Sequence, residues 1–155
     1  YKTLKDKAET AAGRPRVMLN TPYGDQWVMP STGSYIAQLI RDAGGEYVYR
    51  QNTSNQSMPI DMEEAYLLTA SADVWMNVGQ TASLDELTRL YPKFADTPPV
   101  QTHQVWQPIL RATPGGGNDF WESSVVHPDL VLQDLLMMFH PNLLDAPFFY
   151  YKRLE

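Results

Sequence analysis

An α/β fold with a mostly parallel central sheet and helices on both faces is predicted by two features of the sequence. Short apolar runs, typical of buried strands, alternate along the chain with segments whose apolar residues recur at helical spacing. The expected helices are also too short and too widely spaced for a helical bundle. We therefore expect a three-layer αβα, Rossmann-like lobe, and the 155 residues suit a single domain.

The individual elements follow from their end signals. Asp61 with Glu64, and Ser83 with Glu86, have the spacing of a capping box and open two helices. Pro128 suits the first position of a third helix, which is apolar almost all round and should be largely buried. Helices are expected at 1–13, 35–43, 61–70, 83–90 and 128–139. Strands are expected at 17–19, 26–29, 46–49 and 73–78, with residues 100–106 extended and a polar loop at 51–58.

The composition excludes several functions. A net charge of -6 without a basic run argues against nucleic acid as a partner. The absence of cysteine excludes disulfides, thiolate metal sites and cysteine nucleophiles. His103, His127 and His140 do not have metal-ligand spacing, and no Ser/His/Asp motif is present. We therefore expect neither a metal nor a cofactor, and we expect a protein that is not an enzyme.

A ligand site is expected beyond the carboxyl ends of the strands, where open α/β sheets bind their ligands. The loops at 23–27, 49–57, 79–81 and 118–122 fall there, and they are rich in aromatic residues. Ordinary half-buried packing is the alternative for each ring, but several together favour a site. The candidate ligand contacts are Tyr23, Trp27, Tyr49, Gln80, Asp119, Phe120 and Trp121.

Glu63 and Glu64 lie together at the start of the helix that Asp61 caps. Carboxylates in a first turn stabilise the helix dipole by about 0.3–1 kcal/mol. If Glu64 closes the capping box, Glu63 points outward. It is then either a simple dipole-favourable charge or a contact to an arginine of a partner.

Several segments, in this order, carry a resemblance to a known family. They are Arg14-Pro-Arg-Val, Gly33-Ser-Tyr-Ile-Ala-Gln-Leu-Ile, Ala43-Gly-Gly, Asp61-Met-Glu-Glu, Ala72-Asp-Val-Trp, Pro128-Asp-Leu-Val-Leu-Gln-Asp-Leu and His140-Pro-Asn-Leu. Together they resemble the C-terminal lobe of the substrate-binding proteins of ABC importers for iron-siderophores, haem and cobalamin. Asn118-Asp-Phe-Trp-Glu resembles the branch that binds iron compounds.

The resemblance implies a two-lobed protein with its ligand between the lobes. Residues 1–13 would end the long interdomain helix, and residues 14–155 would form the C-terminal ligand-binding lobe, without the N-terminal lobe. The ligand would be an iron-siderophore or a similar metal chelate. Glu63 matches a glutamate that docks onto permease subunits, and Asp119-Phe-Trp matches a cleft segment. The expected location is the periplasm, with a lipid anchor in the full-length form.

Some positions depart from the family pattern. The loop at 51–57 lacks an aromatic residue found in some cobalamin-type members, which weakens a cobalamin interpretation. Arg50 and Arg111 are the only candidates for binding a carboxylate-rich siderophore. Two other interpretations stay open: an enzyme lobe of related doubly wound architecture, and a carbohydrate-binding or adhesion lobe.

Overall fold

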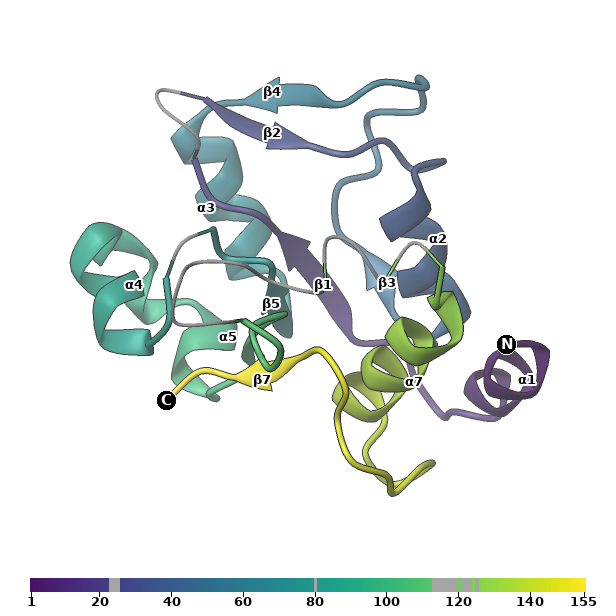
Figure 1. Ribbon diagram of the computed structural model, residues 1–155. Coiled ribbons are helices and arrows are strands. Elements are labelled where there is room, and N and C mark those ends of the chain that lie inside the picture. The colour runs from purple at the N-terminus through teal and green to yellow at the C-terminus, as the bar shows by residue number, and fades with distance from the viewer. Residues whose placement is uncertain (23–25, 80, 113–119, 121–123, 125) are drawn as a thin grey trace.

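The fold is built on a five-stranded sheet with the strand order β3-β1-β5-β6-β7 (Figure 1). The computed structural model describes residues 1–22, 26–79, 81–112, 120, 124 and 126–155. β3 (Glu46–Tyr47), β1 (Arg16–Leu19), β5 (Val74–Met76) and β6 (Val105–Gln107) are parallel. β7 (Lys152–Arg153) closes one edge and runs antiparallel to β6. The mostly parallel sheet is therefore confirmed.

Helices cover both faces of the sheet, which completes the predicted three layers. α1 (Lys2–Glu9) and α2 (Tyr35–Asp42) contact α7 (Pro128–Phe139) on one side. α3 (Met62–Ala70), α4 (Leu84–Leu90), the 3₁₀ helix η1 (Pro92–Asp96) and α5 (Pro98–Gln101) form a second group (Figure 1). None of the helices that the structure describes has the length and hydrophobicity needed to cross a bilayer.

The helix ends agree with the predicted capping. Asp61 accepts a hydrogen bond from the backbone N–H of Glu64 at 2.7 Å, and Ser83 accepts one from Glu86 at 3.1 Å. Pro128 is at the start of α7, and eight of its twelve residues are buried. α1 is shorter than the predicted helix at 1–13, because it ends at Glu9 with Thr10 as its C-cap.

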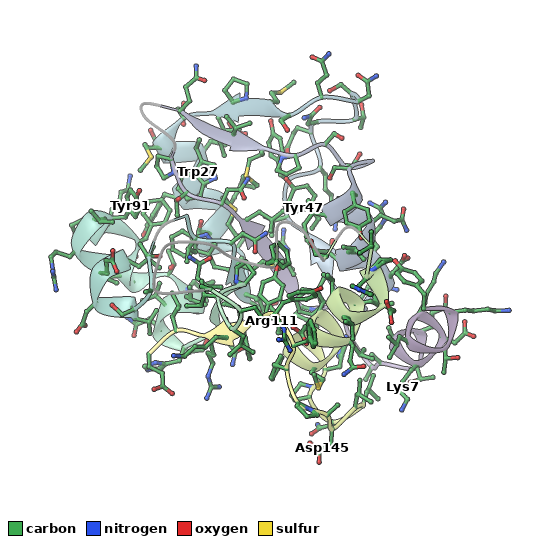
Figure 2. The ribbon with its side chains drawn as sticks, in the orientation of Figure 1. Lys7, Trp27, Tyr47, Tyr91, Arg111 and Asp145 are labelled. Carbon is green, nitrogen blue, oxygen red and sulfur yellow. The ribbon has the colours of Figure 1, made fainter. Side chains whose placement is uncertain are left out.

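A separate antiparallel ribbon joins β2 (Trp27–Met29) to β4 (Met58–Ile60) (Figure 1). An aromatic cluster beneath it connects the ribbon to the sheet and to η1. The Trp27 ring lies 6.0 Å from the Trp75 ring and 5.5 Å from the Phe94 ring, measured between centroids. Trp27 is only 1% exposed, and its indole N–H donates to the Leu19 carbonyl at 3.1 Å (Figure 2). These contacts make Trp27 part of the core.

The C-terminal segment is anchored to α7 by one buried carboxylate. Asp134 is 0% exposed and accepts hydrogen bonds from the backbone N–H groups of Phe149, Tyr150 and Tyr151 at 2.9, 2.7 and 2.9 Å. The anchored segment leads directly into β7, and the Leu154 N–H donates to the Val105 carbonyl at 2.8 Å. Asp134 therefore holds the strand that closes the sheet.

Candidate functional site

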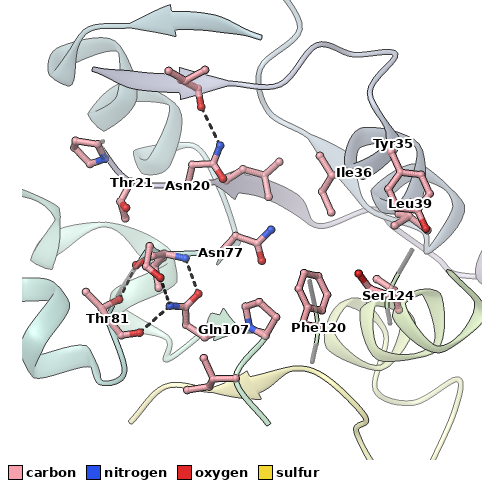
Figure 3. Close-up of a pocket in the computed structure, with 18 of the residues that line it drawn as sticks. Asn20, Thr21, Tyr35, Ile36, Leu39, Asn77, Thr81, Gln107, Phe120 and Ser124 are labelled. Atoms are coloured by element: carbon pink, nitrogen blue, oxygen red, sulfur yellow. Dashed lines mark hydrogen bonds between the residues drawn. The ribbon is translucent and has the colours of Figure 1, made fainter. Parts of the chain in front are cut away.

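A cavity of about 880 Å³ lies at the carboxyl edge of the sheet (Figure 3). We call it the carboxyl-edge cavity. Its lining includes residues that follow three neighbouring strands: 20–22 after β1, 77–79 after β5 and 108–109 after β6. The predicted site at this edge therefore coincides with a real hollow, and its size suits a ligand of several hundred daltons.

The side walls of this cavity are largely apolar. Tyr35, Ile36 and Leu39 come from α2 on one side, and Phe120 lies opposite them (Figure 3). Val131 of α7 also lines the cavity. Among the described residues that line the cavity, none carries a charged side chain. Such a wall favours apolar or aromatic ligand surface and gives no counter-charge to an anionic group.

The floor is organised by a glutamine. Gln107 is 2% exposed, and its amide oxygen accepts from the Val78 N–H at 2.8 Å. Its amide nitrogen donates to the carbonyls of Gly79 and Thr81 at 3.0 and 2.7 Å. One side chain at the end of β6 thus fixes the loop that follows β5.

Gly79 is required at its position in this loop. Its φ is +67°, and a Cβ there would lie 2.4 Å from the Thr21 hydroxyl oxygen. The loops after β1 and β5 therefore approach each other more closely than any side chain at position 79 allows. Thr21 and Gly79 both line the cavity.

Only part of the predicted ligand set can be placed. Phe120 lines the cavity, 7% exposed, and its ring packs edge-on against Tyr150 and Tyr151. Trp27 and Tyr49 are buried, at 1% and 3% exposure, and do not line the cavity. We correct their assignment to packing, because their rings are enclosed by the ribbon and the sheet. Tyr23, Gln80, Asp119 and Trp121 lie outside the described residues.

The two arginines that were candidates for binding a carboxylate-rich siderophore lie outside the cavity. Arg50 pairs with Glu46, and Arg111 stacks over the Phe149 ring at 3.5 Å (Figure 2). Neither lines the carboxyl-edge cavity. His140 contacts the Gly44 carbonyl at 2.9 Å, a structural contact. Within the described part of the chain, no three His, Asp or Glu side chains group as a metal site would require.

Sequence reasoning missed three polar residues of the cavity, Asn20, Asn77 and Gln107. Each lies at or just after the carboxyl end of a buried strand. That position was itself the available signal, since such ends converge on one edge of a parallel sheet. The candidates chosen at these strand ends were mostly aromatic, so the two asparagines and the glutamine were not among them.

The comparisons with known proteins agree with this architecture. The family model described as periplasmic binding protein matches residues 1–107. An uncharacterized lipoprotein of Methanocaldococcus jannaschii is 25% identical over 131 residues, which cover 83% of this chain and 30% of that protein. An ABC transporter solute binding protein from Sulfurospirillum deleyianum superposes with a TM-score of 0.66 at 18% identity, covering 95% of this chain and 44% of that one.

A third similar protein is IsdE of S. aureus, whose structure was solved in complex with heme. Its TM-score is 0.60 at 18% identity, covering 90% of this chain and 52% of that chain. This chain thus spans about half, or less, of the proteins it resembles. The family model and the Sulfurospirillum deleyianum protein are both described as binding proteins. The chain belongs to the periplasmic binding protein family.

Proposed function

We propose that this chain is one lobe of the substrate-binding component of an ABC importer, and that it covers the apolar face of a metal chelate. The observation that carries the proposal is the carboxyl-edge cavity, which is open, largely apolar and without a described charged side chain. A haem macrocycle or the organic shell of a neutral ferric siderophore offers a surface of that kind. A carboxylate-rich siderophore would require cations, which the described walls do not supply.

Exposed apolar side chains at the rim of the cavity favour a second protein surface on the opposite side of the ligand. Tyr35, Leu90 and Val28 line the cavity and are 57%, 57% and 36% exposed. Apolar side chains gathered around a hollow mark a surface that another body covers. We assign that role to an N-terminal lobe of the same protein, with residues 1–13 ending the helix that joins the two lobes. Such a component works outside the cytoplasm, and lipid anchoring would agree with the lipoprotein relative.

Ligand titration tests this proposal. Haemin, ferrioxamine B and cobalamin should be titrated against the full-length protein while tryptophan fluorescence is followed. Trp75 is a suitable reporter, because its indole N–H donates at 2.8 Å to the carbonyl of Asn20 in the cavity wall. We expect quenching by haemin or ferrioxamine B. No response to any of the three would refute the ligand class.

Docking to the permease is assigned to Glu63. This exposed residue is the second residue of α3. Because Asp61 supplies the N-cap, Glu63 is available to an arginine of a partner. We expect Glu63→Arg to leave chelate affinity unchanged. The ligand-stimulated ATPase activity of the reconstituted importer should fall at least tenfold, which corresponds to a loss of about 1.4 kcal/mol in docking free energy.

The chain offers a matched control for this variant. Asp85 is likewise exposed and is the second residue of α4, two residues after the N-cap Ser83. Asp85→Arg therefore makes the same charge reversal at an equivalent helix position. Equal ATPase losses in both variants, or no loss in Glu63→Arg, would show that Glu63 is not the docking contact.

A further inference from the structure

We propose that Asn20 and Asn77 act as a pair that binds one neutral carboxamide-like group of the ligand, an acceptor oxygen beside a donor N–H. The proposal rests on the function assigned above, because it requires that the ligand enter the carboxyl-edge cavity. It adds a chemical preference to that function: a ligand with an uncharged amide at the floor of the cavity.

The two asparagines occupy equivalent places on neighbouring strands. Leu19 of β1 pairs with Met76 of β5, so Asn20 and Asn77 are the next residues of both strands. The Asn20 N–H still donates to the Met76 carbonyl, at 3.2 Å. Adjacent strands lie about 4.8 Å apart, a spacing that lets two side chains contact one functional group. Figure 3 shows both side chains at the cavity.

Both residues have left-handed backbone conformations, with φ of 73° at Asn20 and 61° at Asn77. Asparagine tolerates this conformation better than most residues, which alone could explain its presence. A backbone requirement does not account for the side chains, however. Each amide is also held by a specific hydrogen bond to another part of the fold.

These hydrogen bonds leave the Asn20 oxygen and the Asn77 nitrogen available to a ligand. The Asn20 amide nitrogen donates to the Val28 carbonyl at 2.9 Å, which leaves its oxygen as an acceptor. The Tyr151 hydroxyl donates at 2.8 Å to the Asn77 oxygen, which leaves the nitrogen as a donor. Within the described residues, neither the Asn20 oxygen nor the Asn77 nitrogen has another hydrogen-bond partner.

Tyr151 fixes the orientation of Asn77 because its hydroxyl keeps its proton. Complete burial of the ring raises the pKa of Tyr151 far above the usual value. In the structure this hydroxyl donates to the Asn77 oxygen, so the Asn77 amide nitrogen is the atom turned away from Tyr151. The backbone N–H of Tyr151 is in turn held by Asp134 at 2.9 Å. The donor at Asn77 is thus positioned by the core.

The surroundings decide which group the pair prefers. The lining is apolar apart from a few polar side chains, so a hydrogen bond made there faces little competition from water. A neutral donor and a neutral acceptor match a carboxamide. A carboxylate would place an acceptor oxygen against the Asn20 oxygen, which is itself an acceptor. It would also lose its hydration without gaining a counter-charge.

Glycine variants test the pair without straining the backbone. Asn20→Gly and Asn77→Gly keep the left-handed conformation and remove the amide. Ferrioxamine B, a ferric trihydroxamate with secondary amides in its linkers, should be titrated against the full-length protein. We expect each variant to bind it at least about tenfold more weakly. A ligand polar group that is buried without its partner loses affinity, and about 1.4 kcal/mol corresponds to a tenfold change. Asn77→Asp, which keeps the shape but replaces the donor with an acceptor, should weaken binding further.

His103→Gly is the matched control. His103 also has a positive φ, 58°, but it is exposed and lies before the amino end of β6. It should bind like the wild type. If all three asparagine variants bind ferrioxamine B as tightly as the wild type, the proposed role of the pair is wrong. The proposed function would still stand. If the wild type binds neither ferrioxamine B nor haemin, the proposed function fails and the pair fails with it.

Discussion

Replacing Asp134 with alanine is expected to lower the free energy of unfolding by about 3 kcal/mol, because each buried N–H left unpaired costs about 1–3 kcal/mol. The buried N–H groups of Tyr150 and Tyr151 and the half-buried N–H of Phe149 lose their acceptor at once. The variant also no longer has to bury a carboxylate, and removing that desolvation cost offsets part of the loss. Asp134→Asn should lose less, since its remaining oxygen can still accept. Urea unfolding measures both.

Asp129→Ala is the control on the same helix. Asp129 is exposed in the first turn of α7, so its removal should cost only the dipole interaction, about 0.3–1 kcal/mol. If Asp134→Ala cost no more than Asp129→Ala, the C-terminal segment would not depend on this carboxylate.

The same carboxyl group makes stability depend on pH. Burial raises the pKa of Asp134 above its ordinary 3.8, and the backbone donors and Arg111 oppose that rise only in part. The folded state therefore keeps the proton to a higher pH than the unfolded state. The resulting stability is fully present below pH 3.8 and is lost as the pH rises through the raised pKa. The stability of the wild type relative to Asp134→Asn should fall over that range, and a rise would contradict the assignment.

Gln107→Met is expected to cost about 2–4 kcal/mol of stability and to weaken chelate binding in the same variant. Methionine matches the length of glutamine but offers no amide, so the Val78 N–H and the carbonyls of Gly79 and Thr81 lose their partner inside the fold. The loop after β5, which forms the cavity floor, is then no longer fixed. Urea unfolding and ferrioxamine B titration of the full-length protein measure the two effects.

Gln104→Met is the matched comparison. Gln104 precedes the same strand, is half-buried and accepts one hydrogen bond, from the Trp106 indole at 3.2 Å. It lies away from the carboxyl-edge cavity. We expect a stability loss of about 1 kcal/mol or less and normal binding. A binding loss of the same size in both variants would show that Gln107 acts only through general stability.

The sequence predicted the main elements of the fold because caps and apolar runs are local signals. Asp61, Ser83 and Pro128 each begin the helix they were expected to begin. β4 was missed because Pro59 lies in its centre, where it pairs with Val28 in a ribbon of only two strands. Residues 100–101 were expected to be extended but belong to α5, since Pro98 suits a first helical position.

The site was harder to predict than the fold. The sequence predicted a site at the carboxyl edge of the sheet, and a cavity that Phe120 lines lies at that edge. Trp27 appeared to be a surface aromatic because turn residues surround it, but stacking on Trp75 and Phe94 buries it. Those partners are distant in sequence, so no local pattern reveals them. The orientation of Asn77 likewise depends on Tyr151, 74 residues further along the chain.

The 155 residues contain no cysteine, so a thiol introduced into them allows a direct test of the central claim, that the carboxyl-edge cavity receives the chelate. Leu90 and Leu67 are a matched pair of helical leucines, 57% and 62% exposed, and of the two only Leu90 lines the cavity. Leu90→Cys and Leu67→Cys in the full-length protein should be alkylated with and without saturating ferrioxamine B or haemin. We predict that a chelate slows alkylation at position 90 at least tenfold and leaves position 67 unchanged. Binding without protection at position 90 would contradict the account.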